Sequence, residues 1–353
     1  MRRNWWTPLV LLHEKLEDKM TQVMGLRASR RGVWAVLIGL PLLALTASLC
    51  AHAQEFPVKP VRVVVPYSAG GPVDMMARAV AKYMANASGQ PFTVENRGGA
   101  GGTIGTALVA RAAPDGYTVV FNGTLAHTLG PMLRPKSAGY TLSDMSAVGI
   151  FSSSSNFLVV TPSLNVKSVK ELIARAKAEE GKLAFSSAGP ASNPHLGAEL
   201  FKSLAGVQME HIAYKGVSDT VPDLVSGRVP VAFASPTLAL PLIRDNRIVA
   251  LATTGEKRMK GWEQLPTTAE AGVPGYVFES TYIMAAPVKT PAVVMARLNA
   301  LLQQALDDPD TRTALEKLGL EPMKNTTAQA DQLVVAELRR WEDIVRRLDL
   351  RLE

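Results

Sequence analysis

The stretch PVRVVVPYSAGGPVD, residues 60–74, decides the fold class. Val61 to Val65 form an apolar, β-branched run, which predicts a strand buried on both faces of a parallel sheet. A flexible turn, Tyr67 to Gly71, comes next, and Pro72 suits the first position of a helix. Asp74 falls in the first helical turn, where a carboxylate complements the helix dipole. The stretch therefore predicts a strand, a turn and a helix in succession.

The same order recurs along the chain. We expect further strands at 92–95, 117–121, 156–161, 183–186, 229–234 and 248–252, and helices beginning near 103, 168, 193 and 291. Strands and helices that alternate with short connections are typical of α/β proteins.

The length and composition of the chain favour two domains. It has 353 residues, 47% of them hydrophobic, which is more than one typical domain. Two extended stretches, at 152–161 and 276–286, are expected to cross between the domains, so that one domain is inserted in the other. We expect a leader at 1–53, the first part of domain I at 54–155, domain II at 156–278, and the return of domain I with C-terminal helices at 279–353.

The N-terminus has the pattern of a cleaved signal peptide. A basic cluster, Arg27, Arg30 and Arg31, precedes the apolar run Val33 to Leu49, and Ala51-His52-Ala53 is a small-x-small cleavage site. We expect cleavage after Ala53 and a periplasmic location. A membrane anchor is the alternative, although the run is at the short end of a span. Cys50 is the only cysteine, and an aliphatic residue directly before it disfavours lipid attachment, so the mature chain has no thiol and no disulfide.

Charge gives little support for a nucleic-acid partner. The formal net charge is +7, but residues 1–53 hold seven Lys/Arg and three Asp/Glu, which leaves 31 basic and 28 acidic residues after the leader. No basic run with interleaved aromatic residues follows the leader. We therefore expect no nucleic-acid binding.

Three flexible loops, at 67–74, 186–195 and 214–220, lie between an expected strand and an expected helix. Such loops lie at the carboxyl ends of strands, where open α/β sheets bind ligands. A helix N-terminus adds unpaired N–H groups and a partial positive charge, which suit a carboxylate or phosphate. None of the three loops contains an arginine. Each loop alone is explained by turn chemistry, but together they predict one shared anion site.

Features of an enzyme are weak. The segment Gly98 to Thr103 resembles a phosphate loop but lacks the lysine, and no Gly-x-Ser-x-Gly elbow occurs. His195 and Glu199 stand one helical turn apart, but a metal site needs at least one more ligand. We expect no catalytic residue, metal or cofactor, although a Ser/His/Asp triad involving His127 or His195 stays open.

Several motifs together resemble the Bug family, the substrate-binding components of tripartite tricarboxylate transporters. They are PVRVVVPYSAGG at 60–71 with Asp74 and Arg78, VENRGGAGG at 94–102, PDGYT at 114–118, HLGAE at 195–199, YKG at 214–216 and EAGVPGY at 270–276. The resemblance implies an α/β, two-domain periplasmic binding protein of type II (Venus-flytrap), with parallel-rich sheets flanked by helices. Pro72, Pro230 and Thr281 depart from residues common in the family, which affects the identity of the ligand more than the fold.

The resemblance and the loops together imply a solute-binding protein that captures a small carboxylate (an organic acid, amino acid or related compound) and hands it to the membrane subunits of a tripartite tricarboxylate-type transporter. We expect a monomer. A periplasmic hydrolase on a similar scaffold and a co-receptor for signalling are the alternatives. The expected ligand-binding residues are Tyr67, Ser68, Ala69, Gly70, Gly71, Asp74, Thr124, Ser187, Gly189, Ser192, His195, Tyr214, Lys215, Gly216 and Ser235.

Overall fold

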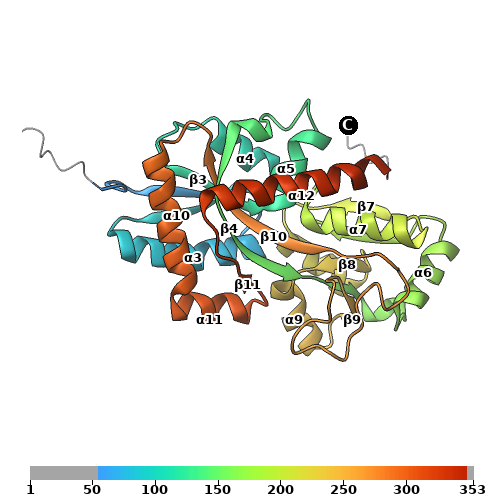
Figure 1. Ribbon diagram of the computed structural model, residues 1–353. Coiled ribbons are helices and arrows are strands. Elements are labelled where there is room, and N and C mark those ends of the chain that lie inside the picture. Colours follow the sequence, from blue (N-terminus) through green and yellow to red (C-terminus); the bar gives the residue numbers. More distant parts are fainter. Residues whose placement is uncertain (1–54, 348–353) are drawn as a thin grey trace, which may run out of the picture. The chain divides into compact units, whose positions relative to one another are not determined.

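The computed structural model describes residues 55–347, which form two β-sheets with helices on their faces (Figure 1). The first sheet has six strands in the order β11-β4-β10-β3-β1-β2, and the second has five in the order β7-β6-β8-β5-β9. The strands of the first sheet are β1 (Val61–Val65), β2 (Phe92–Asn96), β3 (Thr118–Gly123), β4 (Met145–Ser155), β10 (Glu279–Pro287) and β11 (Glu321–Pro322). Those of the second are β5 (Phe157–Val160), β6 (Ala184–Ser187), β7 (Glu210–Ala213), β8 (Val231–Ala234) and β9 (Val249–Thr253).

The helices connect these strands. In the half of the chain before β6 they are α3 (Pro72–Ser88), α4 (Thr103–Ala110), α5 (Thr124–Leu133) and α6 (Val169–Ala178). After β6 they are α7 (Asn193–Ala205), α8 (Val221–Ser226), α9 (Pro236–Arg244), α10 (Ala292–Asp307), α11 (Pro309–Lys317) and α12 (Thr327–Arg347). Within residues 55–347, none of the helices combines the length and apolar character needed to cross a bilayer.

Side chains alternate between two cores along the strands of the first sheet. Val61, Val63 and Val65 pack with the apolar faces of α3 and α10, whereas Val64 packs on the opposite face with α4 and the first half of α12. Both faces of β1 are thus covered, which explains its uninterrupted valine run. The prediction drawn from residues 60–74 is confirmed for this strand, its turn and its helix.

The second sheet has the same organisation. Leu158 and Val160 of β5 face a core shared with α6 and α7, while Phe157 and Val159 face a core with α8 and α9. The neighbours β6, β7 and β8 pair in parallel, but β5 pairs antiparallel with β8 and β9. The first sheet is likewise mixed, since β1, β2 and β3 are parallel and β10 is antiparallel to both β3 and β4. The expectation of parallel-rich sheets therefore holds for β1, β2 and β3 and for β6, β7 and β8. The crossing strands β5 and β10 run antiparallel to their neighbours.

The chain passes between the sheets at two neighbouring places. Strand β4 ends at Ser155 and β5 begins at Phe157, so Asn156 alone joins the first sheet to the second. The return strand β10 begins at Glu279, which pairs with Ser155. Asn156 Nδ2 donates to Ser280 Oγ at 2.9 Å and ties the two crossings together. These crossings lie where the sequence placed the domain boundaries, but the division into domains stays a prediction.

Two helices belong to both halves. Leu125, Leu129 and Leu133 of α5 pack into the core of the second sheet, although α5 directly follows β3 of the first. Helix α12 buries Ala330 and Val334 against the first sheet, and near its end Trp341 and Ile344 against the second (Figure 1).

Candidate functional site

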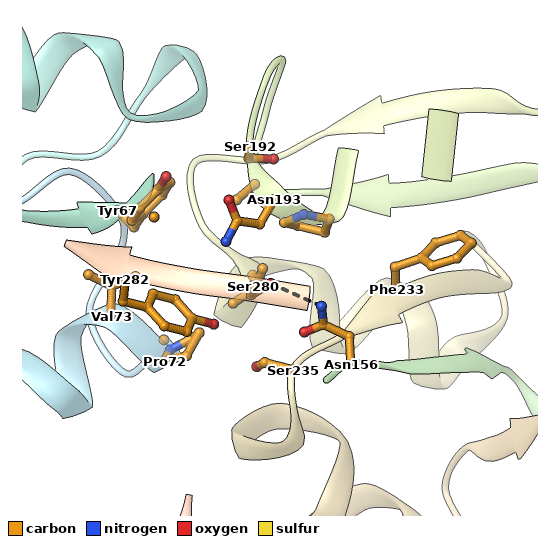
Figure 2. Close-up of a pocket in the computed structure, with 15 residues that line it drawn as sticks. Tyr67, Pro72, Val73, Asn156, Ser192, Asn193, Phe233, Ser235, Ser280 and Tyr282 are labelled. Atoms are coloured by element: carbon orange, nitrogen blue, oxygen red, sulfur yellow. Dashed lines mark hydrogen bonds between the residues drawn. The ribbon is translucent and has the colours of Figure 1, made fainter. Parts of the chain in front are cut away.

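A cavity of about 490 Å³ lies where the two sheets approach each other (Figure 2). From the first sheet and its loops it is lined by Tyr67, Gly71, Pro72, Val73, Gly123, Ser280 and Tyr282. From the second it is lined by Asn156, Ala188, Ser192, Asn193, Pro194, Val217, Phe233 and Ser235. This lining contains apolar and neutral polar residues but no Asp, Glu, Lys, Arg or His.

Four helices begin at this cavity. Their N-caps are Gly71 for α3, Gly123 for α5, Ser192 for α7 and Ser235 for α9, and all four residues line it. Each helix follows a strand of its own, respectively β1, β3, β6 and β8, so the cavity lies at the carboxyl ends of four strands. Open α/β sheets bind ligands at this edge.

None of these four N-caps accepts a side-chain hydrogen bond from its helix. Gly71 and Gly123 have no side chain to do so, and the Ser192 hydroxyl donates instead to the Gly189 carbonyl at 2.6 Å. In contrast, α6 and α11 begin away from the cavity and are capped by Ser168 and Asp308. Since the first N–H groups of a helix have no intrahelical partner, four sets of donors are left for a bound molecule.

Two polar side chains of the lining are buried without a partner. Asn193 is 7% exposed and Ser235 is 6% exposed. Neither polar atom of the Asn193 amide has a hydrogen-bond partner, and the Ser235 hydroxyl has none. Figure 2 shows the Asn193 amide directed into the space between Tyr67 and Ser280. Buried polar groups are nearly always hydrogen-bonded, so these atoms of the lining are available to a partner in the cavity.

Asp74 organises the first loop. Its carboxylate accepts hydrogen bonds from the Gly70 amide at 3.0 Å, from Arg78 Nε at 3.0 Å and from Asn96 Nδ2 at 3.0 Å. Burial by itself would raise the pKa of Asp74, but the bonds from Arg78, Gly70 and Asn96 outweigh it and lower the pKa. Asp74 therefore stays ionised and holds the turn before α3, as its place in the first helical turn predicts.

Tyr67 supports the start of α5. Its hydroxyl donates to Asn122 Oδ1 at 2.9 Å, and the same oxygen accepts a hydrogen bond from the Gly123 amide at 2.7 Å. Asn122 Nδ2 in turn donates to Thr106 Oγ1 at 3.0 Å. Burial raises the pKa of Tyr67 far above its usual value, so the phenol remains a neutral donor. Thr124, the first residue of α5, is fully buried, and its hydroxyl has no partner.

Loops of the two sheets touch each other beside the cavity. The Ser68 hydroxyl donates to Asp219 Oδ2 at 2.6 Å, and the Ser218 hydroxyl donates to the Ala69 carbonyl at 3.0 Å. A Cβ added at Gly216 would lie 2.8 Å from the Ser68 nitrogen. The expected residues Ser68, Ala69 and Gly216 thus hold the loops against each other, and they do not line the cavity.

A second close contact joins two glycine loops. A Cβ added at Gly101 would lie 1.7 Å from the Pro190 carbonyl oxygen, and one at Gly189 would lie 2.7 Å from the Gly101 nitrogen. Both glycines have positive φ, +66° and +103°, a conformation that glycine adopts without strain. The glycines allow the backbones of the two sides to meet.

The expected residues Ser187 and His195 lie in a buried aromatic cluster behind the cavity wall. The rings of His195 and His211 are 4.1 Å apart, Phe185 stacks on His211, and Ser187 Oγ lies 2.6 Å from His211 Nε2. Burial lowers the pKa of His195 to about 3 and that of His211 to about 4. Both rings are therefore neutral and weakly basic at pH 7. Ser187 is buried and outside the lining, which gives the hydrolase alternative no support.

Tyr214 and Lys215 also lie outside the cavity. They line a separate hollow with Gly98, Gly99 and Ile104, and the Tyr214 hydroxyl donates to Asp223. Lys215 is exposed. Across residues 55–347, no three His, Cys, Asp or Glu side chains gather closely enough to hold a metal ion.

The cavity therefore brings together four of the expected residues, Tyr67, Gly71, Ser192 and Ser235. Three more, Gly70, Asp74 and Thr124, are each next in the chain to a residue of the lining, namely Gly71, Val73 and Gly123. Sequence reasoning missed Asn156, Asn193, Ser280 and Tyr282. Asn193-Pro194 was expected only to open a helix, and its position at a strand-to-helix connection was the available signal. Ser280 and Tyr282 lie on a crossing strand, where the sequence carries no loop pattern.

Comparison with known proteins agrees with this geometry. The model of the tripartite tricarboxylate transporter family receptor matches residues 76–350. The solved periplasmic binding protein BugD is 31% identical, with a TM-score of 0.79 over 84% of this chain and 99% of that one.

Two further solved relatives carry ligands. The R. palustris protein Rpa4515, solved with adipate, is 34% identical with a TM-score of 0.79, covering 83% of this chain and 98% of that one. MatC from Rhodopseudomonas palustris, solved with bound malate, is 32% identical with a TM-score of 0.78, covering 82% and 100%.

These matches confirm the two-domain periplasmic binding-protein fold and the resemblance to the Bug family. The family and its solved members are binding receptors, which also confirms that the chain is not an enzyme. The chain belongs to the family of tripartite tricarboxylate transporter receptors, a family of periplasmic solute-binding proteins.

Proposed function

We propose that this receptor captures a small carboxylate in the cavity between its two sheets and delivers it to the membrane subunits of a tripartite tricarboxylate-type transporter. One observation carries the proposal: four helices begin at the cavity, and none of them has a side-chain cap. Each helix N-terminus supplies about half a positive charge and unpaired N–H donors. The ligand carboxylate would take the place of the missing caps.

The composition of the lining supports recognition by the backbone. No arginine or lysine lines the cavity, so no guanidinium group would form a bidentate contact with the ligand carboxylate. Hydrogen bonds from N–H groups to a carboxylate are charge-assisted, and they gain strength where water is excluded. The relatives solved with adipate and malate bind carboxylates, which supports the same ligand class here.

We place the ligand against Tyr67, Gly71, Ser192 and Ser235, with Thr124 beside it at the start of α5. Pro72, Pro194 and Pro236 lack an N–H group, so α3, α7 and α9 each offer one donor fewer in the first turn than α5 does. Ser68, Ala69 and Gly216 would hold the loops together beside the ligand, and Ser187 and His195 would support the wall from behind. Tyr214 and Lys215 lie at the separate hollow and are not part of this placement. Val73, Val217 and Phe233 contribute apolar walls for the body of the ligand.

Ligand capture would involve closure about the two crossings near Ser155 and Glu279, with domain I at 54–155 and 279–353 and domain II at 156–278. The contacts of Ser68 with Asp219 and of Gly101 with Pro190 join the two sides, and we assign them to the closed form. Small-angle scattering should show a more compact particle when ligand is added. Curves that do not change at saturation would contradict closure.

The leader lies outside the described residues, and its removal stays part of the proposal. Export with cleavage after Ala53 would leave Gln54 as the first residue of a soluble monomer. Mass spectrometry of protein exported by its native host should find this N-terminus without lipid. A mature chain that retains the apolar run at 33–49 would contradict the proposal.

The proposed function is tested by a thermal-shift screen of carboxylic acids. A ligand that binds the native state raises Tm by mass action, by an amount that grows with its concentration relative to Kd. We expect at least one small carboxylate, and no matched neutral amide or alcohol, to raise Tm. If uncharged analogues shift Tm as much as the acids do, the anion site is wrong.

A further inference from the structure

The Asn193 amide has a free donor and a free acceptor, and a carboxylate can pair only with the donor. Its amide is buried in the cavity wall, and both Nδ2 and Oδ1 lack partners. An unpaired buried polar group costs about 1–3 kcal/mol. The amide carries donors on nitrogen and an acceptor on oxygen, and exchanging the two atoms leaves the same requirement. A bound molecule that pairs both atoms presents an acceptor and a donor to one side chain.

A carboxylate satisfies only half of this requirement. An ionised carboxylate accepts hydrogen bonds and donates none, so it pairs with Nδ2 and leaves Oδ1 unpaired. The donor and the acceptor of Asn193 are attached to one carbon. The donor of the ligand must accordingly lie next to its carboxylate, as a substituent on the neighbouring carbon does. A hydroxyl and an ammonium group are the two common donors at that position.

The charge of the site distinguishes between these two donors. The lining includes no acidic side chain, and four helix N-termini contribute positive potential. The acids near the loops are already engaged, since Asp74 pairs with Arg78 and Asp219 accepts from Ser68. An ammonium group would be buried without a counter-charge, which is far more costly than burying a hydrogen-bonded hydroxyl.

We infer that the preferred ligands are 2-hydroxycarboxylates, whose hydroxyl donates to Asn193 while the carboxylate accepts from it and from the helix starts, and that the 2-amino analogues are rejected. Asn193 is then the residue that determines specificity. This inference rests on the proposed function and narrows its substrate class.

The test compares acids that differ only at carbon 2. Calorimetry at pH 7 is done with four sets, each containing the unsubstituted, hydroxy and amino acid: propionate, lactate and alanine; succinate, malate and aspartate; glutarate, 2-hydroxyglutarate and glutamate; adipate, 2-hydroxyadipate and 2-aminoadipate. In every set that binds, we expect the hydroxy acid to bind at least about tenfold more tightly than the other two, a difference of about 1.4 kcal/mol.

An amino or unsubstituted acid that binds as tightly as its hydroxy counterpart overturns the inference and leaves the proposed function intact. If no acid of any set binds, the proposed function fails and the inference fails with it.

Variants at Asn193 assign the preference to this residue. Asn193→Leu removes both polar atoms at similar volume and should reduce the ratio of hydroxy to unsubstituted affinity to about one. Asn193→Asp adds the missing counter-charge, and we expect the amino acid to gain at least about tenfold relative to the hydroxy acid. Unchanged ratios in both variants overturn the inference.

Thr290→Val is the matched control, because the Thr290 hydroxyl is also buried without a partner but lies outside the lining. It should change neither affinity nor the ratio. Ser235→Ala removes the unpaired Ser235 hydroxyl of the lining, and it should weaken all acids of a set equally. Thermal unfolding of each variant verifies that the fold is retained. If Asn193→Leu does not fold, Asn193→Asp and the ligand sets still decide the question.

Discussion

The Asn193 amide lies directly against the backbone of Gly123, so closely that a Cβ at Gly123 would come within 2.9 Å of Asn193 Oδ1. Gly123 ends β3 in the first sheet, and Asn193 begins α7 beside the second. The contact therefore joins two of the helix starts at the cavity, one from each side. It also fixes the position of the amide that faces the cavity.

Substituting Gly123 tests this contact. Gly123 has φ of −69°, so alanine adopts its backbone conformation without strain. We expect Gly123→Ala to displace the Asn193 amide and to weaken binding of the tightest acid by about tenfold or more, measured by calorimetry.

A double-mutant cycle provides the control. In an Asn193→Ala background the colliding oxygen is gone, so adding Gly123→Ala should weaken binding much less than it does alone. Strictly additive losses would show that Gly123 acts independently of Asn193.

Gly71 offers a graded test of the cavity. A Cβ there would lie 3.6 Å from both the Ser68 oxygen and Val217 Cγ2, an ordinary contact, and φ of −81° suits any residue. Gly71→Ala should fold and bind nearly as the parent does. Gly71→Val places two further methyl groups at the start of α3 and should abolish detectable binding, with Tm little changed. A folded Gly71→Val variant with parental affinity would remove the first loop from the site.

The contact between Gly101 and Pro190 can be separated from backbone strain. Gly101 and Gly89 have similar positive φ, +66° and +71°, but a Cβ at Gly89 meets nothing within 4 Å. Each alanine variant should lose about 1 kcal/mol of stability from strain in the left-handed region. Only Gly101→Ala should also weaken ligand binding, because its Cβ collides with the Pro190 carbonyl oxygen when the loops meet. Equal affinities in the two variants would show that this contact is not needed for capture.

The sequence predicted the strand-to-helix connections and the two crossings, but it did not predict helix α5. Val61 to Val65 and Pro72 were identifiable because one apolar run and one proline specify a buried strand and a helix start. Helix α5 was missed because Gly130 and Pro131 lie inside it, although Leu125, Leu129 and Leu133 repeat at helical spacing. Its identification would have shown that Thr124 starts a helix at the cavity.

The candidate site was predictable only in part, for a physical reason. A loop between a strand and a helix can be identified in the sequence by its glycine and proline residues. Gly71 and Ser192 were therefore predicted as site residues. Which sides of the loops face each other depends on how the two sheets pack, and no local pattern encodes that packing. Ser68 and Gly216 therefore contact each other and do not line the cavity. Asn156 and Tyr282 line the cavity from the crossing segments.

Buried histidine makes stability depend on pH. His127 in α5 is 1% exposed, and burial lowers its pKa to about 4 from the usual 6.5. Between these values the unfolded chain binds a proton that the folded chain does not, so stability falls as the pH is lowered from 6.5 to 4. The contribution of His127 to this fall is about 3 kcal/mol.

Urea denaturation at pH 7 and pH 4.5 measures this dependence. His127→Leu removes the titrating group and should reduce the difference in unfolding free energy between the two pH values. His195 and His211 also have lowered pKa values and add to the fall in stability. Because both are present in the parent and in His127→Leu, their contributions cancel when the two proteins are compared. An unchanged difference would mean that His127 takes up its proton equally in the folded state.

Uncapped helix starts are proposed to hold the ligand carboxylate, and a crystal structure with the tightest-binding acid at pH 7 would show its contacts. We predict carboxylate oxygens at about 2.7–3.1 Å from backbone N–H groups in the first turns of at least two of α3, α5, α7 and α9, with the Asn193 amide paired to the ligand. A carboxylate held by an arginine or lysine, or a ligand bound outside the cavity with these N–H groups still unpaired, would show that the helix starts do not form the carboxylate site.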